Sequence, residues 1–540
     1  MTDVRPSPGT DSAAPLFFSP LGQPVPLCSV AALRQLEHAA AAELPPHTLM
    51  ARAGHAAARF LLAQRTDTNA ETNTNTNAST PAPRPVWIIA GPGNNGGDAL
   101  VMASELQRAG VAVQVCLPQP VSTDTARWAL ATAQAAGVPV SAAVPATFDA
   151  SHWIVDGMFG IGLTRPLDGV FAALAQRLRH HTRHHGKVLA LDLPSGLHSD
   201  TGEEIEVGNA VQASHTLSFI AAKPGLFMAS GRDHAGHVSI APLGLDGITS
   251  TFVLNAPALF GASMPPRDFA SHKGRFGSLA VIGGDTGLCG APVLAARAAL
   301  HAGAGKVHVV LLSREAPAYD PPYPELMLHP AGTLPLASMS ALALGCGMGQ
   351  RARARRLLRQ ALALDLPTLL DADALNLLAA DAALAAYVSA RNRQGQPCLL
   401  TPHPLEAARL LGVTTAAVQR DRLAAARALV ERFACVVVLK GSGTLVAAPD
   451  GRCALNPTGG PALASGGTGD VLGGLIGALL AQQLPVYEAA LAGVYLHGLA
   501  ADTLSALGDG PAGLTAGELA PMVRKLINRF FYSHANGSAQ

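Results

Sequence analysis

The chain has 540 residues, of which 49% are hydrophobic and 14% charged; this length accommodates two to four domains, and this composition excludes a globally disordered protein. Its 38 Lys and Arg residues nearly balance its 37 Asp and Glu residues, for a formal net charge of +1. The overall charge therefore does not favour binding to nucleic acid or to an anionic membrane.

Cysteine usage and hydropathy predict the cellular environment. The seven cysteines are scattered without a C-x-x-C pair, which predicts reduced thiols rather than disulfides or a zinc ribbon. The start of the chain lacks a basic segment followed by an apolar run, as a secretory signal requires. The longest apolar stretch, Val471 to Ala481, is too short to span a bilayer. We therefore expect a cytoplasmic protein without a membrane span.

Two stretches of low complexity interrupt the N-terminal part of the chain. Residues 1–25 are rich in Pro, Ser and Gly and predict a flexible tail. Residues 66–85 are rich in Thr, Asn and Pro and follow a helical pattern over residues 31–64 that is too short to fold alone. This second stretch therefore predicts an insertion in a surface loop and not a domain boundary.

From residue 86 onward, short apolar runs alternate with helix-like segments, which predicts parallel strands covered by helices on both faces. The pattern breaks within residues 246–268 and then restarts. The sequence thus predicts an α/β protein with a first domain at 26–245, a linker at 246–268 and a second domain at 269–535. Strands are expected at 86–90, 111–117, 153–155, 188–191, 278–282, 306–312, 341–344, 368–370, 398–400 and 435–439, and helices at 99–109, 123–136, 291–301 and 416–433.

A glycine-rich loop follows the first expected strand. The string G-P-G-N-N-G-G-D, Gly91 to Asp98, opens directly into a helix. Glycines let the backbone turn sharply and approach a ligand closely, and the free amides at a helix start attract an anion. The loop predicts a site for a dinucleotide or a sugar phosphate; the alternative is a tight strand-to-helix turn capped by Asp98.

Two further strand ends of the first domain carry oxygen-bearing side chains. Asp156 precedes G-M-F-G-I-G-L-T-R-P, Gly157 to Pro166, and Asp192 begins D-L-P-S-G, which contains Ser195. Ligands of open α/β sheets bind outside the carboxyl ends of the strands, so we expect these ends to share a crevice with Asn95. Such oxygens suit a monovalent cation or a catalytic acid–base pair. A lone aspartate at a strand end would instead be only a cap.

These three strings, in this order, make the region from Ala31 to about Leu245 resemble the epimerase domain of the bacterial bifunctional NAD(P)H-hydrate repair enzymes, which has a Rossmann-like doubly wound sheet. The resemblance implies that Asp192 is catalytic and that a potassium ion binds at Asn95, Asp156 and Ser195. The residues that it implies for binding the hydrate are Asn94, Asn95, Gly96, Gly97, Asp98, Gly160, Ile161, Gly162, Leu163, Thr164, Arg165, Pro166 and Asp192.

A second set of motifs lies in the C-terminal half. The string S-G-G-T-G-D, Ser465 to Asp470, opens an apolar helix, where backbone amides can stabilise a transferring phosphoryl group and the aspartate can accept a proton. The alternative is a glycine-rich helix start with Asp470 as a first-turn charge. The segment Lys440 to Thr444 follows the expected strand at 435–439, and its position predicts a second contact with phosphate or ribose. His403 lies between two prolines that fix its backbone, which favours a functional role.

From Phe269 to about Asn528 the chain resembles the ribokinase-like fold and, within it, the ADP-dependent NAD(P)H-hydrate dehydratases. The strings H-K-G-x-x-G, G-G-D-x-G-x-x-G-A, D-A-D-A-L-N, T-P-H-P-x-E, K-G-S-G-T and S-G-G-T-G-D-V-L carry this resemblance. It implies that Asp470 is the catalytic base. The residues that it implies are Ala291, Gly347, His403 and Asp470 for the hydrate, and Lys440, Gly441, Ser442, Gly443, Thr444 and Gly469 for the nucleotide.

Together the two resemblances imply metabolite repair. The first domain would interconvert the S and R epimers of hydrated NADH and NADPH (NADHX and NADPHX), and the second would dehydrate the S form at the expense of ADP, giving AMP and phosphate. The expected partners are these small molecules, Mg²⁺ bound with ADP, potassium in the epimerase site, and further copies of the chain in a homo-oligomer. The alternative is a ribokinase-like vitamin or sugar kinase fused to a non-catalytic nucleotide-binding module.

Overall fold

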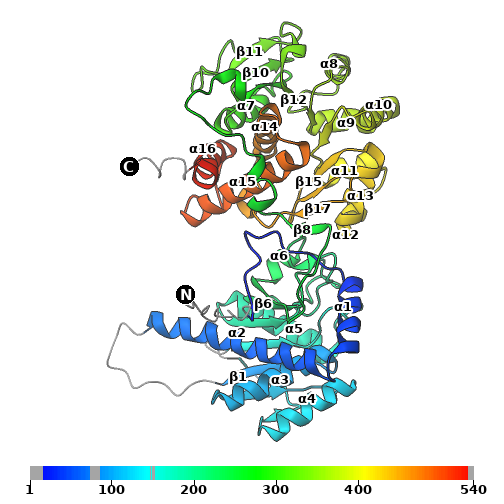
Figure 1. Ribbon diagram of the computed structural model, residues 1–540, viewed down its shortest axis with the longest axis vertical. Helices are drawn as coiled ribbons and strands as arrows, with labels where there is room; N and C mark the ends of the chain where they lie inside the picture. The colour runs from blue at the N-terminus through cyan, green and yellow to red at the C-terminus, as the bar shows by residue number, and fades with distance from the viewer. Residues whose placement is uncertain (1–15, 73–84, 146, 149–152, 533–540) are drawn as a thin grey trace, which may run out of the picture.

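The computed structural model describes residues 16–72, 85–145, 147–148 and 153–532. The chain forms two α/β domains that lie end to end (Figure 1). The first contains a seven-stranded sheet and the second a ten-stranded sheet, which confirms the predicted fold class. Within the described ranges, no helix combines the length and the hydropathy needed to cross a membrane.

The first sheet is entirely parallel, with the strand order β3-β2-β1-β4-β5-β6-β7. The chain winds outward from β1 in one direction and from β4 in the other, so the strand order reverses between them. Helices cover both faces, which explains why the central strands read as continuous apolar runs. The strands are β1 (Val86–Ala90), β2 (Val113–Cys116), β3 (Val140–Ser141), β4 (Trp153–Gly157), β5 (Lys187–Leu191), β6 (His215–Phe219) and β7 (His237–Ala241).

Two helices of the first domain, α1 and α4, begin at side-chain caps. The hydroxyl of Ser29 accepts from the N–H of Ala32 at the start of α1, and Thr123 accepts from Ala126 at the start of α4; each satisfies an amide that has no partner within the helix. The helices are α1 (Val30–Glu43), α2 (Thr48–Thr72), α3 (Asn94–Arg108), α4 (Asp124–Ala135), α5 (Gly169–Arg183), the short α6 (Gly231–His234) and the 3-10 turn η1 (Pro224–Leu226).

The second sheet has the order β11-β10-β9-β12-β13-β14-β15-β16-β17-β8. The pairs among strands β9 to β15 are all parallel, whereas β16 is antiparallel to both β15 and β17. The strand order of this second sheet reverses between β9 and β12. The strands are β8 (Phe252–Leu254), β9 (Ser278–Gly283), β10 (Lys306–Leu311), β11 (Met327–Pro330), β12 (Ala341–Leu344), β13 (Thr368–Leu370), β14 (Cys398–Leu400), β15 (Val436–Leu439), β16 (Leu445–Ala447) and β17 (Cys453–Leu455).

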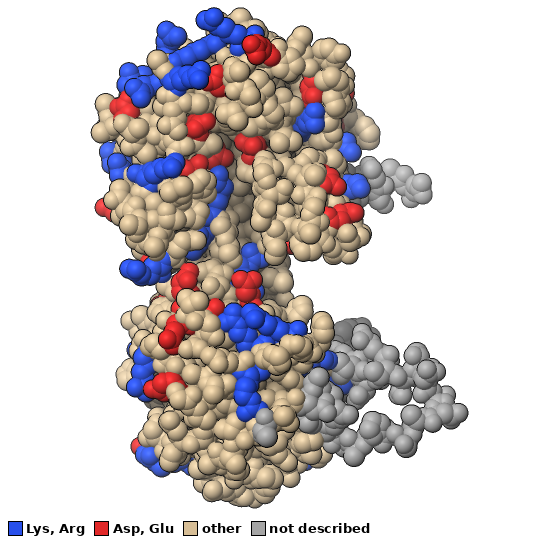
Figure 2. Space-filling view, turned by 180° about the vertical axis from the view of Figure 1, so that it is seen from behind, with Lys and Arg blue, Asp and Glu red and all other residues tan. Residues whose placement is uncertain are grey.

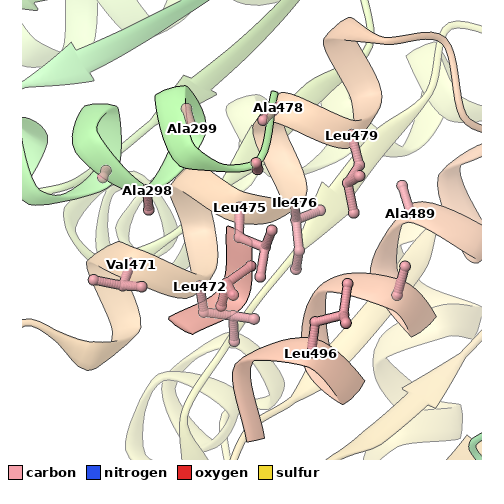
Figure 3. Close-up of a cluster of buried hydrophobic side chains, with 14 of the residues drawn as sticks. Ala298, Ala299, Val471, Leu472, Leu475, Ile476, Ala478, Leu479, Ala489 and Leu496 are labelled. Atoms are coloured by element: carbon pink, nitrogen blue, oxygen red, sulfur yellow. The ribbon is translucent and has the colours of Figure 1, made fainter. Parts of the chain in front are cut away.

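The core of the second domain is built around α14, which is buried on all sides. Figure 3 shows Leu475, Ile476 and Leu479 of α14 among side chains from α7 and α15. Small residues allow close packing here: a Cβ built on Gly474 would lie 1.8 Å from the carbonyl oxygen of Ala295 in α7. The helices are α7 (Gly290–His301), α8 (Ala352–Leu362), α9 (Ala372–Ala380), α10 (Ala382–Arg393), α11 (Pro404–Leu411), α12 (Thr415–Arg420), α13 (Arg422–Phe433), α14 (Thr468–Ala481), α15 (Val486–Ala506) and α16 (Ala516–Ile527).

The segments of low complexity differ in part from the expectation. Residues 1–15 and 73–84 lie outside the described residues, but residues 16–25 contact the fold: Phe18 forms a backbone bridge with Ile240, and Val25 is buried. The long helix α2 continues into the predicted insertion as far as Thr72. The segment expected to be a linker, 246–268, supplies strand β8 to the edge of the second sheet by pairing with β17.

Two of the expected helical stretches are interrupted. The pattern over residues 31–64 belongs to α1 and α2, which are separated at Pro45 and Pro46 because proline cannot continue a helix. The expected helix at 416–433 is divided into α12 and α13 at Asp421, whose carboxylate accepts from the N–H of Ala424 and begins the second helix.

Candidate active sites

The first candidate site is a cavity at the carboxyl ends of β1 and β4, where the strand order of the first sheet reverses. Its volume is about 1070 Å³, and α3 starts at its wall, so unpaired first-turn amides are available there. The lining residues come from α1, α2 and the loops that follow β1, β4, β5 and β6. They include Arg34, Glu37, His47, Met50, Asn94, Asn95, Asp98, residues 160–165, Asp192, Phe219 and Lys223.

A buried lysine faces the predicted catalytic aspartate of this cavity. Nζ of Lys223 lies 2.7 Å from Oδ1 of Asp192 and donates to the hydroxyl of Ser218 at 2.8 Å and the carbonyl of Phe219 at 3.0 Å. Asp192 follows β5 with φ of +67°, and its N–H donates to the carbonyl of Leu217 at 2.8 Å. The aspartate is therefore held as a paired carboxylate in a backbone conformation that few residues with a Cβ adopt.

Two more carboxyl groups line the same wall. Burial, followed by the charges of Asp192 and Glu37, raises the pKa of Asp98 well above its usual value. Burial and Asp192 also raise the pKa of Glu37, although Lys223 opposes the rise. Three carboxyl groups beside one buried ammonium favour a retained proton, which such a cluster can give to a substrate and take back.

Among the residues predicted to bind potassium, Asp156 and Ser195 have hydrogen-bond partners within the protein, whereas the Asn95 side chain has none. Oδ1 of Asp156 accepts from the Ser195 hydroxyl at 2.7 Å, and Oδ2 accepts from the Ser195 N–H at 2.9 Å. Burial still raises the pKa of Asp156 to about 6, against these hydrogen bonds. Both side-chain polar atoms of Asn95 are buried without a hydrogen-bond partner. A weakly hydrated cation would give the Asn95 oxygen a partner and favour ionised Asp156, so these residues fit potassium.

The predicted hydrate-binding residues fall into two groups. Asn94, Asn95, Asp98, Asp192 and residues 160–165 line the cavity, whereas Pro166 is not among the lining residues. A Cβ built on Gly96 would lie 1.9 Å from the carbonyl oxygen of Gly91, and one on Gly97 would lie 2.4 Å from Cε of Met50. These two glycines therefore allow α3 to pack closely against the loop after β1 and against α2.

Sequence reasoning missed Lys223 and Glu37. The lysine lies four positions after the end of β6, a strand that was not among those predicted, so the sequence did not indicate its place beside Asp192. Glu37 projects from α1, and no local motif shows which face of that helix meets the cavity. A lysine within a few residues of the end of β6 was the signal that could have indicated the first of them.

In the second domain, strand ends bring a lysine and an aspartate together. Asp371 follows β13 and Lys440 follows β15, and Nζ of the lysine lies 2.8 Å from Oδ1 of the aspartate. Burial lowers the pKa of Lys440, but Asp371 and Glu406 together raise it above its usual value. The lysine thus stays charged at the carboxyl edge of the sheet, where it can attract phosphate groups.

Asp470, the predicted base, lies in the first turn of α14 beside this pair. Burial raises its pKa, and a hydrogen bond with the Cys346 side chain opposes the rise. A Cβ built on Gly469 would lie 3.7 Å from Nζ of Lys440, and Gly467 precedes the helix with φ of +90°. The structure therefore gathers a carboxylate, an ammonium and free helix amides, which are the groups that phosphoryl transfer requires.

The remaining residues predicted for hydrate binding lie at neighbouring strand ends. Gly347, with φ of +58°, follows β12, and a Cβ on it would lie 3.6 Å from Cβ of Ala291 in α7. His403 follows β14 and caps α11: its Nδ1 accepts from the N–H groups of Leu405 and Glu406, each at 3.2 Å. This cap explains the rigid loop, and it leaves the His403 side chain half exposed.

The predicted nucleotide loop, Lys440 to Thr444, is fixed from two directions. Arg422, buried at the start of α13, donates to the carbonyls of Lys440 and Gly443 at 3.3 Å each. The hydroxyl of Ser442 donates to the carbonyl of Ala229 in the first domain at 2.9 Å. The loop is therefore held by contacts on both sides of the domain boundary.

Comparison with known proteins finds a family match for each of the two domains. The family described as "YjeF-related protein N-terminus" matches residues 46–225, and the family described as "NAD(P)H-hydrate dehydratase" matches residues 279–519. The bifunctional NAD(P)H-hydrate repair enzyme of Coxiella burnetii is 36% identical over 514 residues, which cover 92% of this chain and 98% of that protein. The chain belongs to this family. This match extends across both domains.

Other relatives match most of the chain or about half of it. The Escherichia coli bifunctional repair enzyme is 37% identical over 82% of this chain and 84% of its own length. The ADP-dependent (S)-NAD(P)H-hydrate dehydratase of Neisseria meningitidis is 49% identical over 48% of this chain and 88% of its own length. A Bacillus subtilis ADP/ATP-dependent NAD(P)H-hydrate dehydratase crystallised with ATP and Mg²⁺ is 32% identical, covers 51% of this chain and 98% of that one, and has a TM-score of 0.45. The family matches do not support the alternative of a vitamin or sugar kinase.

Proposed function

We propose that this repair enzyme interconverts the S and R epimers of hydrated NADH and NADPH in its first domain and dehydrates the S form in its second. ADP is the phosphoryl donor of the second step, and the products are NADH or NADPH, AMP and phosphate. The observation that carries the proposal is the presence of two carboxylate–lysine centres, one at each sheet, in a chain whose relatives are named bifunctional repair enzymes. One substrate then explains why two sites share a chain.

In the first site, Asp192 moves protons at the C6 centre of the hydrate. Lys223 orients its carboxylate through the 2.7 Å contact, while the raised pKa of Asp98 makes that side chain a proton reservoir. The helix start at Asn94 and the loop of residues 160–165 border the same cavity, which supports their proposed contact with the phosphates and ring of the hydrate.

In the second site, Asp470 accepts the proton of the C6 hydroxyl as that oxygen attacks the β-phosphorus of ADP. The bond to AMP breaks. Phosphate then leaves from C6 while the adjacent C5 loses a proton, and the resulting C5=C6 double bond restores the reduced ring. Lys440 and the amides of residues 466–469 offset the charge that develops on the transferred group. Ala291, Gly347 and His403 are proposed to hold the hydrate, and residues 441–444 to hold the nucleotide.

Potassium is the proposed cation of the first site, held by Asn95, Asp156 and Ser195. When bound, it would fix the start of α3 relative to the loop after β4 and lower the cost of the buried carboxylate. The unpartnered amide of Asn95 and the buried Asp156 support this proposal.

Mg²⁺ is proposed to enter the second site with ADP, because it neutralises the charge of the diphosphate. The name of the Neisseria meningitidis relative supports ADP as the donor. The cytoplasmic location and the homo-oligomer stay predictions.

One incubation tests the proposed chemistry. The purified chain is mixed with hydrated NADH, ADP and Mg²⁺, while the absorbance of reduced nicotinamide and the release of AMP and phosphate are followed together. Repair predicts that NADH, AMP and phosphate appear in equal amounts. Accumulation of a stable phosphate ester, without recovery of the absorbance, would show a kinase instead.

A further inference from the structure

The nucleotide loop of the second domain is joined to the first domain by reciprocal hydrogen bonds. The hydroxyl of Ser442 donates to the carbonyl of Ala229 at 2.9 Å, and the N–H of Ala229 donates to the carbonyl of Ser442 at 3.1 Å. A Cβ built on Gly443 would lie 2.4 Å from the carbonyl oxygen of Phe227 and 2.6 Å from Cβ of Met228. The backbone of the loop therefore lies directly against residues 227–229.

An arginine of the first domain makes the second connection. Arg232, in the short helix α6, donates to the carbonyls of Pro457 at 3.1 Å and Gly459 at 2.6 Å. The N–H of Asn456 donates to the carbonyl of Thr444 at 2.8 Å, so the segment that Arg232 contacts is itself hydrogen-bonded to the nucleotide loop. Figure 1 shows α6 at the junction, facing the end of the second domain that carries β8 and α12.

Apolar side chains from both domains pack together at this junction. Phe227 and Met228 belong to the same buried cluster as Leu439 and Leu445, which flank the nucleotide loop. The backbone of Leu27 also pairs with Phe252 of β8, which is part of the second sheet. From behind, the molecule is narrowed between the two domains, with acidic and basic side chains on the narrow part (Figure 2). A buried apolar junction with several hydrogen bonds fixes the domains relative to each other.

The same segment leads back to the first site. Lys223, which pairs with Asp192, is followed by η1 and then by residues 227–229. The contacts on the nucleotide loop are thus only a few residues away from the cavity wall of the first domain.

We propose that residues 227–232 of the first domain position the nucleotide loop, so that the affinity of the second domain for ADP depends on the first domain. Ala229 and Arg232 are positioning residues, because they touch the loop and the segment after it and act through them. This proposal rests on the proposed nucleotide role of residues 440–444. Linkage requires the reverse effect as well: ADP must stabilise residues 227–232.

Hydrogen exchange on the intact wild-type chain tests the coupling without any substitution. We expect ADP with Mg²⁺ to slow amide exchange in residues 440–444 and also in residues 227–232, where the N–H of Ala229 reports its bond to Ser442 directly. Protection of the loop alone would overturn the coupling. Absence of protection in both segments would overturn the nucleotide role of the loop and, with it, this proposal.

Kinetics of Arg232→Ala provide the second test, with Arg177→Ala as the matched control. Arg177 also donates to a backbone carbonyl, that of Pro145 at 2.6 Å, but within the first domain. We expect Arg232→Ala to raise the KM for ADP about 5-fold or more, with kcat and the epimerase rate changed less than about twofold, and Arg232→Lys to recover part of the affinity. Arg177→Ala should leave the KM unchanged. An unchanged KM in folded Arg232→Ala, or an equal rise in both variants, would overturn the proposal.

Discussion

Lys223 and Asp192 form an ion pair of 2.7 Å in which the lysine side chain is 1% exposed. Lys440 and Asp371 repeat this relationship at 2.8 Å in the second domain. In each pair the aspartate directly follows a parallel strand, so its position is set by the sheet. The charges at both sites are therefore fixed before a substrate arrives, which is the condition for electrostatic preorganisation.

Lys223→Met tests the cation of the first site. We expect the epimerase rate to fall about 100-fold or more, because Asp192 loses the group that orients it and Lys223 no longer opposes the raised pKa of Glu37. The dehydratase rate for the pure S form should change little. Chiral separation of the two hydrates over time measures the exchange, and Lys525→Met, an exposed lysine of α16, serves as the control. Wild-type exchange in Lys223→Met would show that this lysine is not needed.

The sequence predicted those parts of the fold and the sites that local patterns encode. Strands buried on both faces read as apolar runs, so the boundaries of β1 and β12 were predicted to the residue. Asp192 and Asp470 were found because each adjoins a strand end or a glycine-rich helix start. Strands β16 and β17 were missed because the predicted pattern was one of apolar runs alternating with helices, and no helix separates β15, β16 and β17.

The remaining features depend on tertiary packing. Glu37 reaches the cavity only because of the way α1 packs, which no local pattern shows. Ser442 and Ala229 are 213 positions apart, so their hydrogen bonds follow from the way the two domains meet.

Asp470→Asn tests the base of the second site. The amide keeps the shape of the side chain but cannot accept the hydroxyl proton, so we expect dehydration to fall about 100-fold or more. Epimer exchange, measured in the absence of ADP, should be unaffected. Near-normal formation of NADH from the S form by this variant would rule out Asp470 as the base.

The stabilising effect of potassium is expected to depend on pH. Burial raises the pKa of Asp156 to about 6, above the value in the unfolded chain, so its contribution to stability is most favourable at low pH and is lost as the pH rises through about 6. A cation bound at this carboxylate restores part of the lost stability, but only at a pH where Asp156 is ionised. Potassium chloride should therefore raise the Tm, relative to choline chloride at equal ionic strength, more at pH 8 than at pH 5. The same increase at both pH values would argue against a cation beside Asp156.

Gly474→Ala tests the packing of α14 against α7. The added methyl would meet the carbonyl of Ala295 at 1.8 Å, and overpacking of this kind costs about 1–3 kcal/mol or more. Gly517→Ala is the matched control, because no atom lies within 4 Å of its Cβ position in α16; it should stabilise the protein by about 0.5 kcal/mol or more. Denaturant unfolding followed by circular dichroism measures both. Equal stability of the two variants would contradict the close contact between α14 and α7.

The most direct test of the assignment of one reaction to each site compares the wild-type chain with Asp192→Asn. Each protein repairs an equimolar mixture of the two epimers of hydrated NADH with excess ADP. Absorbance of reduced nicotinamide is followed at enzyme levels where spontaneous epimerisation is slow. The account predicts that the wild type converts all the material, whereas Asp192→Asn repairs about half of it at the wild-type rate and then stops, because removal of an acid–base group abolishes epimer exchange. Identical and complete progress curves for the two proteins would contradict the assignment of epimerisation to Asp192 and the first domain.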